Sequence, residues 1–160
     1  MINLLITLSA FASMEIIAWL THKYIMHGLL WILHKDHHKK DTNGFFERND
    51  FFFLIFAIPG IVGLLIGMQN NFNFLFWIGL GITIYGFSYF LVHDIFIHQR
   101  FKILRNIDNA YFKAIRRAHK MHHKHLGKQH GECFGMLWVP LKYFRKTNTN
   151  NLLWNLLTFL

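Results

Sequence analysis

Three long apolar stretches limit what this chain can fold into. The first runs from Ile2 to Thr21 and carries one charged residue, Glu15, while Phe51–Met68 and Phe72–Val92 carry none. About 20 helical residues span the roughly 30 Å hydrocarbon core of a bilayer. The pattern therefore predicts an all-α, integral membrane helical bundle with three spans, at about residues 2–21, 51–68 and 72–97.

The charged residues are few and confined to short segments. They make up 16% of the chain, against about 25% in an average soluble domain. The 17 Lys and Arg residues all lie within 23–48, 100–128 and 142–146. Such segregation is typical of a membrane protein and argues against a nucleic-acid partner, despite a net charge of +9. The positive-inside rule predicts that segments 22–50 and 98–146 face the cytoplasm.

The C-terminal part of the sequence is compatible with three membrane spans or with a fourth. Residues 133–141 and 152–160 are apolar but too short to cross a bilayer alone. We expect the first stretch to re-enter the membrane or to floor a pocket, and the second to lie at the interface. One domain over residues 1–160 is predicted. The single cysteine, Cys133, excludes a disulfide within the chain and is expected to be a packing residue.

Ten of the twelve histidines fall into two copies of one pattern, H-x4-H followed by H-x2-H-H. Ten imidazoles are more than one metal ion can bind. We therefore predict two metal ions held between the halves of the chain, at the end of the bundle where both copies lie. The predicted ligands are His22, His27, His34, His37, His38, His93, His98, His119, His122 and His123.

The two spacings have different consequences on a helix. Positions i, i+3 and i+4 share a face, so each H-x2-H-H presents three imidazoles in one direction. An i, i+5 pair is about 140° apart on an ideal α-helix. His22 and His27 therefore serve different ions, or the helix loosens as it leaves the membrane. His125 and His130 fall outside the pattern, and surface or hydrogen-bonding roles are favoured for them.

Three carboxylates accompany the histidines. Glu15 lies inside a span, seven residues before His22 and on the same helix face, where an ionisable group suggests function. Asp94 follows His93 directly. Because ligating histidines usually donate their other N–H to a carboxylate or carbonyl, Glu15 and Asp94 are predicted to accept such bonds. Asp36 remains open between this role and a solvated loop charge.

The nitrogen-only ligand set is compatible with zinc, copper, nickel or iron. No general base or nucleophile set accompanies the histidines, so metal-assisted hydrolysis has little support. Iron with open coordination positions would activate oxygen toward apolar substrates of the membrane. A metal-binding membrane protein without catalysis, such as a zinc carrier or a di-haem electron carrier, is the alternative from another class.

Several longer motifs point to one family. The chain resembles the bacterial β-carotene hydroxylases of the membrane fatty acid hydroxylase superfamily over about residues 1–140. The histidine framework is shared with fatty acid hydroxylases, sterol desaturases and alkane hydroxylases, whereas HKYIMHG and LVHDxxxHQR are more specific. The matching sequence motifs are MEIIAWLTHKYIMHG from Met14, WILHKDHH ending at His38, FERND from Phe46, YGFSYFLVHDIFIHQRF from Tyr85, RRAHKMHH ending at His123 and FGMLWVP from Phe134.

The resemblance implies a non-haem di-iron monooxygenase. It would hydroxylate C3 and C3′ of the β-ionone rings of β-carotene, giving β-cryptoxanthin and zeaxanthin, and relatives also convert canthaxanthin to astaxanthin. All ten histidines carry over as ligands of two Fe2+ ions, with O2 as co-substrate. A fatty acyl or sterol hydroxylase of the same superfamily is the nearest alternative.

The chain lacks flavin and nicotinamide motifs, so reduced ferredoxin with its reductase is the expected electron donor. The expected location is the bacterial inner membrane, with the histidines facing the cytoplasm; the oligomeric state is open. Six basic residues are expected to form a docking face for ferredoxin or, equally, a binding surface for anionic lipid headgroups. They are Arg100, Lys102, Arg105, Arg116, Arg117 and Lys120. The walls of a slot for a rod-like hydrocarbon are expected to include Trp19, Phe87, Tyr89, Phe90, Phe134 and Trp138. Helix packing or an interfacial aromatic belt would explain these six residues equally well.

Overall fold

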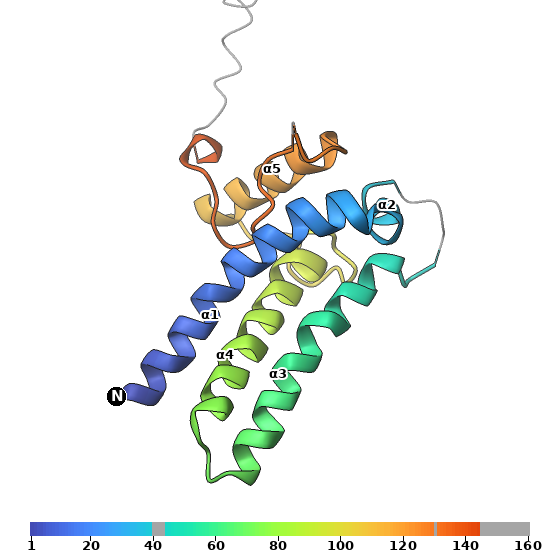
Figure 1. Ribbon diagram of the computed structural model, residues 1–160. Helices are drawn as coiled ribbons and strands as arrows, with labels where there is room; N and C mark the ends of the chain where they lie inside the picture. Colours follow the sequence, from blue (N-terminus) through green and yellow to red (C-terminus); the bar gives the residue numbers. More distant parts are fainter. Residues whose placement is uncertain (40–43, 130, 145–160) are drawn as a thin grey trace, which may run out of the picture.

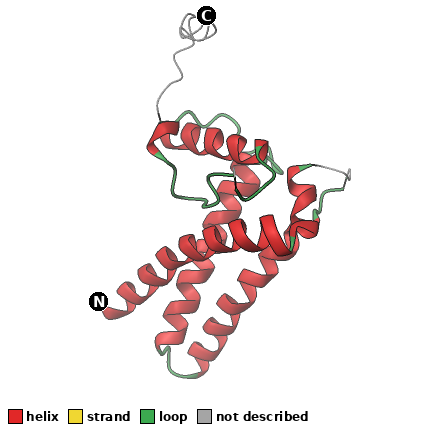
Figure 2. Ribbon diagram, turned by 45° about the horizontal axis from the view of Figure 1, so that its top comes forward, coloured by secondary structure: helices red, strands yellow, loops and turns green. Residues whose placement is uncertain are grey.

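The computed structural model describes residues 1–39, 44–129 and 131–144, and all regular structure in these ranges is helical (Figures 1 and 2). The all-α prediction is confirmed. Helix α4 packs against both α1 and α3, and the three form the long body of the molecule. The elements are α1 (Ile2–Leu20), the π-helix η1 (Thr21–Leu29), α2 (Trp31–His38), η2 (Arg48–Asp50), α3 (Phe51–Gln69), α4 (Phe74–Tyr89), the π-helix η3 (Phe90–Ile97), α5 (Ala110–Lys124) and η4 (Leu141–Tyr143).

Three helices are long and apolar enough to cross a membrane. With their π-helical and 3-10 extensions they cover Ile2–Leu29, Arg48–Gln69 and Phe74–Ile97. The third begins two residues later than predicted, because the side chain of Asn73 accepts the N–H of Leu75 and caps α4. The described residues hold no fourth helix of this kind, and residues 152–160 lie outside them.

Glycines bring the backbones of the three long helices together. A Cβ added at Gly79 of α4 would lie 2.6 Å from the backbone nitrogen of Leu64 in α3. A Cβ at Gly81 would lie 2.5 Å from the carbonyl oxygen of Thr7 in α1. Small residues at such contacts allow the close packing typical of membrane helices. Helix α4 is therefore held on both sides by backbone contacts that a larger side chain would break.

Helix α5 lies across the end of the bundle where α1 and α4 finish (Figure 1). Its N-cap is Asn109, whose side chain accepts the N–H of Tyr111, and the helix buries Ile115 and Ala118. Helix α5 also carries the second H-x2-H-H motif, which ends at His123. The stretch 133–139 is irregular, and it buries Phe134 and Met136 rather than crossing the bundle.

Candidate metal centre

The two π-helices explain the H-x4-H spacing. In a π-helix, residue i bonds to residue i+5, so these two residues lie on the same side. The N–H of His98 donates to the carbonyl oxygen of His93 at 2.9 Å, which spans the motif interval itself. His22 and His27 lie in η1 with ring centroids 5.1 Å apart. Of the two alternatives for these pairs, the structure therefore has the loosened helix.

Nine of the ten predicted ligands gather into two groups in which the ligand nitrogens lie within 4.8 Å of one another. Each group combines residues from both halves of the chain, as expected. All but two of these nine side chains are buried. The five-histidine group consists of His22, His27, His34, His38 and His122. The four-histidine group consists of His37, His93, His98 and His119.

Each H-x2-H-H motif is divided between the two groups. In the first copy, His34 and His38 belong to the five-histidine group and His37 to the other. Positions i+3 and i+4 are about 100° apart on an α-helix, which is enough to direct neighbouring rings to different ions. The second copy is divided the other way round, with its first histidine, His119, in the four-histidine group and its middle histidine, His122, in the five-histidine group.

His123, the tenth predicted ligand, lies between the groups. Its ring centroid is 4.4 Å from that of His38 and 4.5 Å from that of His119. Its Nε2 atom is buried without a hydrogen-bond partner. Outside the pattern, His125 bonds through Nδ1 to the carbonyl oxygen of Met121, and His130 lies outside the described residues.

The outward-facing nitrogens of six histidines bond to oxygen atoms. An amide, carbonyl or ionised carboxylate oxygen can only accept, so each of these Nδ1 atoms carries the proton and leaves a lone pair on Nε2. Such bonds orient ligating histidines in metal sites. The bonds are His22 to Phe134 O (2.9 Å), His27 to Leu126 O (3.0 Å), His34 to Asn49 Oδ1 (2.6 Å), His122 to Glu132 O (3.0 Å), His37 to Glu47 Oε2 (3.0 Å) and His93 to Asp94 Oδ2 (3.4 Å).

The inward-facing nitrogens converge on one another. Nε2 of His22 lies 3.0 Å from Nε2 of His34, and Nε2 of His37 lies 3.1 Å from Nε2 of His93. Two lone pairs at this distance repel unless a cation lies between them. Metal–nitrogen bonds of about 2.1 Å at right angles would separate two ligands by about 3 Å. The donor set therefore fits two metal ions.

The histidines outside the spans are held neutral. Burial lowers the pKa of His34 to about 3 and that of His122 to about 2. Burial, followed by the charge of neighbouring imidazoles, also lowers the pKa of His37 and His119 well below the usual value. Neutral imidazole is the form that binds a metal, so no proton needs to be displaced from these ligands at pH 7.

Of the two carboxylates predicted to accept from histidines, Asp94 does so and Glu15 does not. Glu15 bonds to none of the described histidines; its oxygens accept the hydroxyl of Tyr85 and two backbone N–H groups of the 133–139 stretch. Asp94 lies beside His93, as predicted. Asp36 is 3% exposed and accepts the N–H of Arg48 at 2.6 Å, so it is no solvated loop charge.

Two hydrogen-bond partners of the histidines were not predicted. Asn49 and Glu47 belong to the FERND motif, and they reach His34 and His37 from the segment that leads into α3. FERND is part of the family resemblance, and this is the sequence signal that points to these two residues. No spacing rule links it to histidines 10 to 15 residues earlier in the chain.

Three of the six basic residues expected at a docking face are engaged elsewhere. Arg100, with a side chain 15% exposed, pairs with carboxylates around the four-histidine group. The guanidinium of Arg116 lies 3.9 Å from the ring centroid of Phe96, and Arg117 donates to the carbonyl oxygen of Tyr143. The exposed basic residues of the set are Lys102, Arg105 and Lys120.

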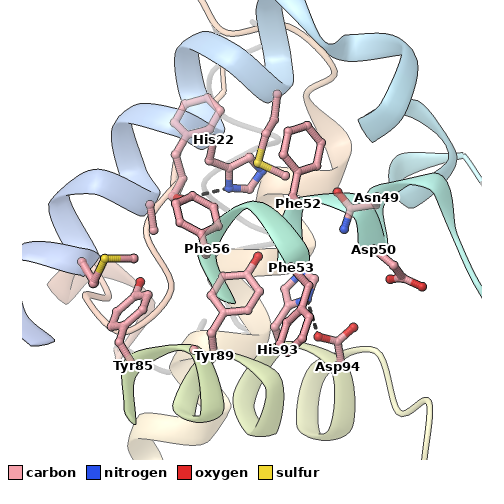
Figure 3. A pocket seen from close by; sticks show the side chains of 15 residues that line it. His22, Asn49, Asp50, Phe52, Phe53, Phe56, Tyr85, Tyr89, His93 and Asp94 are labelled. Carbon is pink, nitrogen blue, oxygen red and sulfur yellow. Dashed lines mark hydrogen bonds and ion pairs between the residues drawn. The ribbon is translucent and has the colours of Figure 1, made fainter. Parts of the chain in front are cut away.

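An apolar pocket between α1, α3 and α4 reaches the histidines (Figure 3). His22 of the five-histidine group and His93 of the four-histidine group both line it. Of the expected slot walls, Tyr89 and Phe134 line this pocket, whereas Trp19, Phe87 and Trp138 are exposed and Phe90 is not among its walls. Wall residues that were not predicted include Met14, Phe52, Phe56, Tyr85 and Gly86.

Comparison with known proteins identifies the family. A family model described as fatty acid hydroxylase matches residues 7–144, a range that includes all ten predicted ligands. The chain therefore belongs to the fatty acid hydroxylase family. No solved structure gives a significant match to the chain.

Several similar proteins are β-carotene hydroxylases. The chain is 41% identical to a β-carotene hydroxylase of Pantoea ananas, over 86% of this chain and 78% of the relative. It is 35% identical to a β-carotene hydroxylase of Paracoccus sp. (strain PC1), over 88% of this chain and 86% of the relative. A chloroplastic β-carotene 3-hydroxylase of Arabidopsis thaliana is 35% identical over 84% of this chain and 44% of its own length.

Proposed function

We propose that this protein is a membrane-bound carotenoid hydroxylase that acts on β-carotene. The observation that carries the proposal is the position of the two histidine groups at the end of an apolar pocket. The similarity to β-carotene hydroxylases over most of the chain supports this substrate class. The reaction would place a hydroxyl group at C3 of one β-ionone ring and then at C3′ of the other, giving β-cryptoxanthin and zeaxanthin.

The ten histidines would hold two Fe2+ ions, which supply the activation of O2 when bound. One oxygen atom enters the C–H bond of the substrate, and the other leaves as water after two electrons and two protons are taken up. Nitrogen ligands suit iron, and the neutral imidazoles can bind without losing a proton. The same donor set would also accept zinc, so the metal must be established by analysis of the purified protein.

The chain itself would orient the substrate and exclude water. The pocket walls from α1, α3 and α4 are mostly apolar, which suits a hydrocarbon ring. The pocket touches one histidine of each group, so a ring placed there would lie beside both ions. Phe134 lines the pocket, and its carbonyl oxygen orients His22.

The membrane setting and electron supply are part of the proposal. The three apolar helices would cross the bacterial inner membrane as one domain over residues 1–160, with the histidine end in the cytoplasm. The basic residues around the histidine groups support this orientation. A reduced ferredoxin and its reductase would supply the electrons, because the sequence contains no flavin or nicotinamide motif.

Pigment chromatography of cells that accumulate β-carotene tests the proposal. Expression of this chain should produce β-cryptoxanthin and zeaxanthin, and canthaxanthin-producing cells should form astaxanthin. His37→Ala should abolish the products, whereas Lys35→Ala, at an exposed position of the same helix, should not. Unchanged β-carotene from a membrane-inserted, iron-loaded protein with a working donor would instead favour an acyl or sterol substrate. A protein that binds metal but oxidises none of these substrates would be a non-catalytic metal binder.

A further inference from the structure

The two histidine groups differ in the charge of the atoms that orient them. In the five-histidine group, the Nδ1 atoms with partners bond to three backbone carbonyls and one amide oxygen. In the four-histidine group, both recorded partners are carboxylates, Glu47 on His37 and Asp94 on His93. The histidine spacing is the same in both copies, so the spacing does not reveal this difference.

The carboxylates of the four-histidine group form a built network. Arg100 binds Asp50 through two bonds of 2.5 and 3.0 Å, and it contacts Asp94 at 3.1 Å and Glu47 at 3.4 Å. The guanidinium thereby fixes both carboxylates that hold histidines. Three carboxylates and one guanidinium leave a formal excess of two negative charges beside the four-histidine group. The side chains of Glu47, Asp50 and Asp94 are only 15–27% exposed.

Among the residues that the structure describes, no comparable carboxylate network surrounds the five-histidine group. Asn49 occupies the position that corresponds to Glu47, and its neutral amide oxygen accepts from His34. The buried Asp36 is oriented toward Arg48, with its Oδ2 atom bonded to the N–H of Arg48 and 3.5 Å from the Nε atom of that residue. A divalent ion placed among these five neutral imidazoles would keep its full charge in a buried, poorly solvated site.

From this difference we infer that the four-histidine site binds its metal ion more tightly, and fills first, although it has fewer ligands in its group. A carboxylate that accepts the N–H of a ligating histidine makes that ligand more basic, and removing such a partner typically costs about 10–100-fold in metal affinity. Two such carboxylates also offset the charge of a buried dication, which is costly to leave uncompensated. The inference rests on the two-metal centre of the proposed function.

Metal titration of the purified, metal-free protein in detergent tests the inference. We choose Co2+ as the probe, because its binding is followed both by calorimetry and by its visible spectrum. Two steps are expected, with affinities that differ by about tenfold or more. His98→Ala should remove the tighter step and His27→Ala the weaker one, which assigns each step to its group.

Two charge variants then test the cause. Glu47→Gln keeps an oxygen acceptor for His37 but removes the charge, and it should weaken the tighter step by about 10–100-fold while the weaker step is unchanged. Asn49→Asp adds a carboxylate at His34 and should tighten the weaker step. The second variant strengthens binding, so its effect cannot be mistaken for a folding defect.

The outcomes separate this inference from the proposed function. Two equivalents bound with equal affinity, or loss of the tighter step in His27→Ala, would overturn the order of filling but leave a two-metal centre in place. Equal weakening of both steps by Glu47→Gln would overturn the role of charge. Hydroxylation of β-carotene is measured separately and does not enter this test.

Discussion

Tyr85 of α4 donates its hydroxyl to Glu15 of α1 at 2.7 Å, inside the part of the bundle that we assign to the membrane. The other oxygen of Glu15 accepts the N–H groups of Leu137 and Trp138, both at 2.9 Å. Three residues earlier than Leu137, the carbonyl oxygen of Phe134 accepts from Nδ1 of His22. Glu15 therefore connects to the metal centre through the 133–139 stretch and not by direct contact.

This connection predicts a graded effect of changes at Glu15. Glu15→Ala removes all three bonds, so the 133–139 stretch should loosen, with lower iron content and less zeaxanthin. Glu15→Gln retains an oxygen for the two backbone N–H groups and loses an acceptor for Tyr85, so its effect should be smaller. Iron analysis and pigment chromatography measure both effects, with Ser13→Ala as the control at an exposed position of α1. Full iron content and activity in Glu15→Ala would refute the connection.

Gly86 offers a test of the substrate pocket. It lines the pocket, and a Cβ added there would meet no atom within 4 Å, so a larger side chain can be accommodated without displacing the backbone. Gly86→Phe should fill the space and lower β-carotene turnover by about tenfold or more, equivalent to about 1.4 kcal/mol in the barrier. Iron content should stay at the wild-type level. Gly63→Phe is not a suitable control, because Gly63 packs tightly against α4.

The matched control is a substitution that points away from the pocket. Ser88→Phe adds the same ring two residues later on α4, at a position that does not line the pocket. This variant should keep wild-type turnover. If Gly86→Phe and Ser88→Phe behave alike, the pocket is not where β-carotene binds.

The three long apolar helices and the clustering of the histidines could be predicted because each depends on local sequence. Apolar runs long enough to cross a bilayer identify the three helices, and the histidines are recognised by their spacing alone. The distribution of ligands between the groups could not be predicted from an α-helical pattern. It depends on the π-helical turns at His22 and His93, where the i, i+5 pairs come onto one side.

The hydrogen-bond partners of the histidines depend on tertiary structure. Asn49 and Glu47 reach the cluster because the segment before α3 folds back over α2, which no periodicity records. The sequence predicts a histidine partner for Glu15 because an uninterrupted α-helix would place Glu15 and His22 on one face. The 133–139 stretch, more than 100 residues away in sequence, lies against Glu15 instead. Long-range contacts of irregular segments are the part that sequence patterns leave undetermined.

The exposed basic residues predict how the electron donor docks. Lys102, Arg105 and Lys120 are exposed, whereas Arg100 is held by carboxylates. Changing the three exposed residues to Glu should slow reduction by an acidic ferredoxin at low salt, with a smaller difference as salt screens the charges. Stopped-flow measurement with Lys35→Glu as the control checks this. Unchanged rates at low salt, combined with weaker binding to anionic vesicles, would assign these residues to lipid headgroups.

The way in which each H-x2-H-H motif is divided between the two groups predicts which metal ion His123 binds. In the first H-x2-H-H motif, the first and last histidines serve one group and the middle one serves the other. The second motif follows the same rule for His119 and His122, with the groups interchanged. Its last histidine, His123, should therefore bind the metal of the four-histidine group, as His38 does in the five-histidine group.

Single substitutions test this assignment. His123→Ala should weaken the same Co2+ binding step as His98→Ala, whereas His38→Ala should weaken the step that His27→Ala removes. His125→Ala is the control, because its Nδ1 bonds to a backbone carbonyl at the end of the same helix. The buried, unpartnered Nε2 of His123 gives the physical reason, since a polar atom left without a partner in a buried site is costly. If His123→Ala instead binds both metal ions as the wild type does, nine histidines are sufficient and His123 is not a ligand.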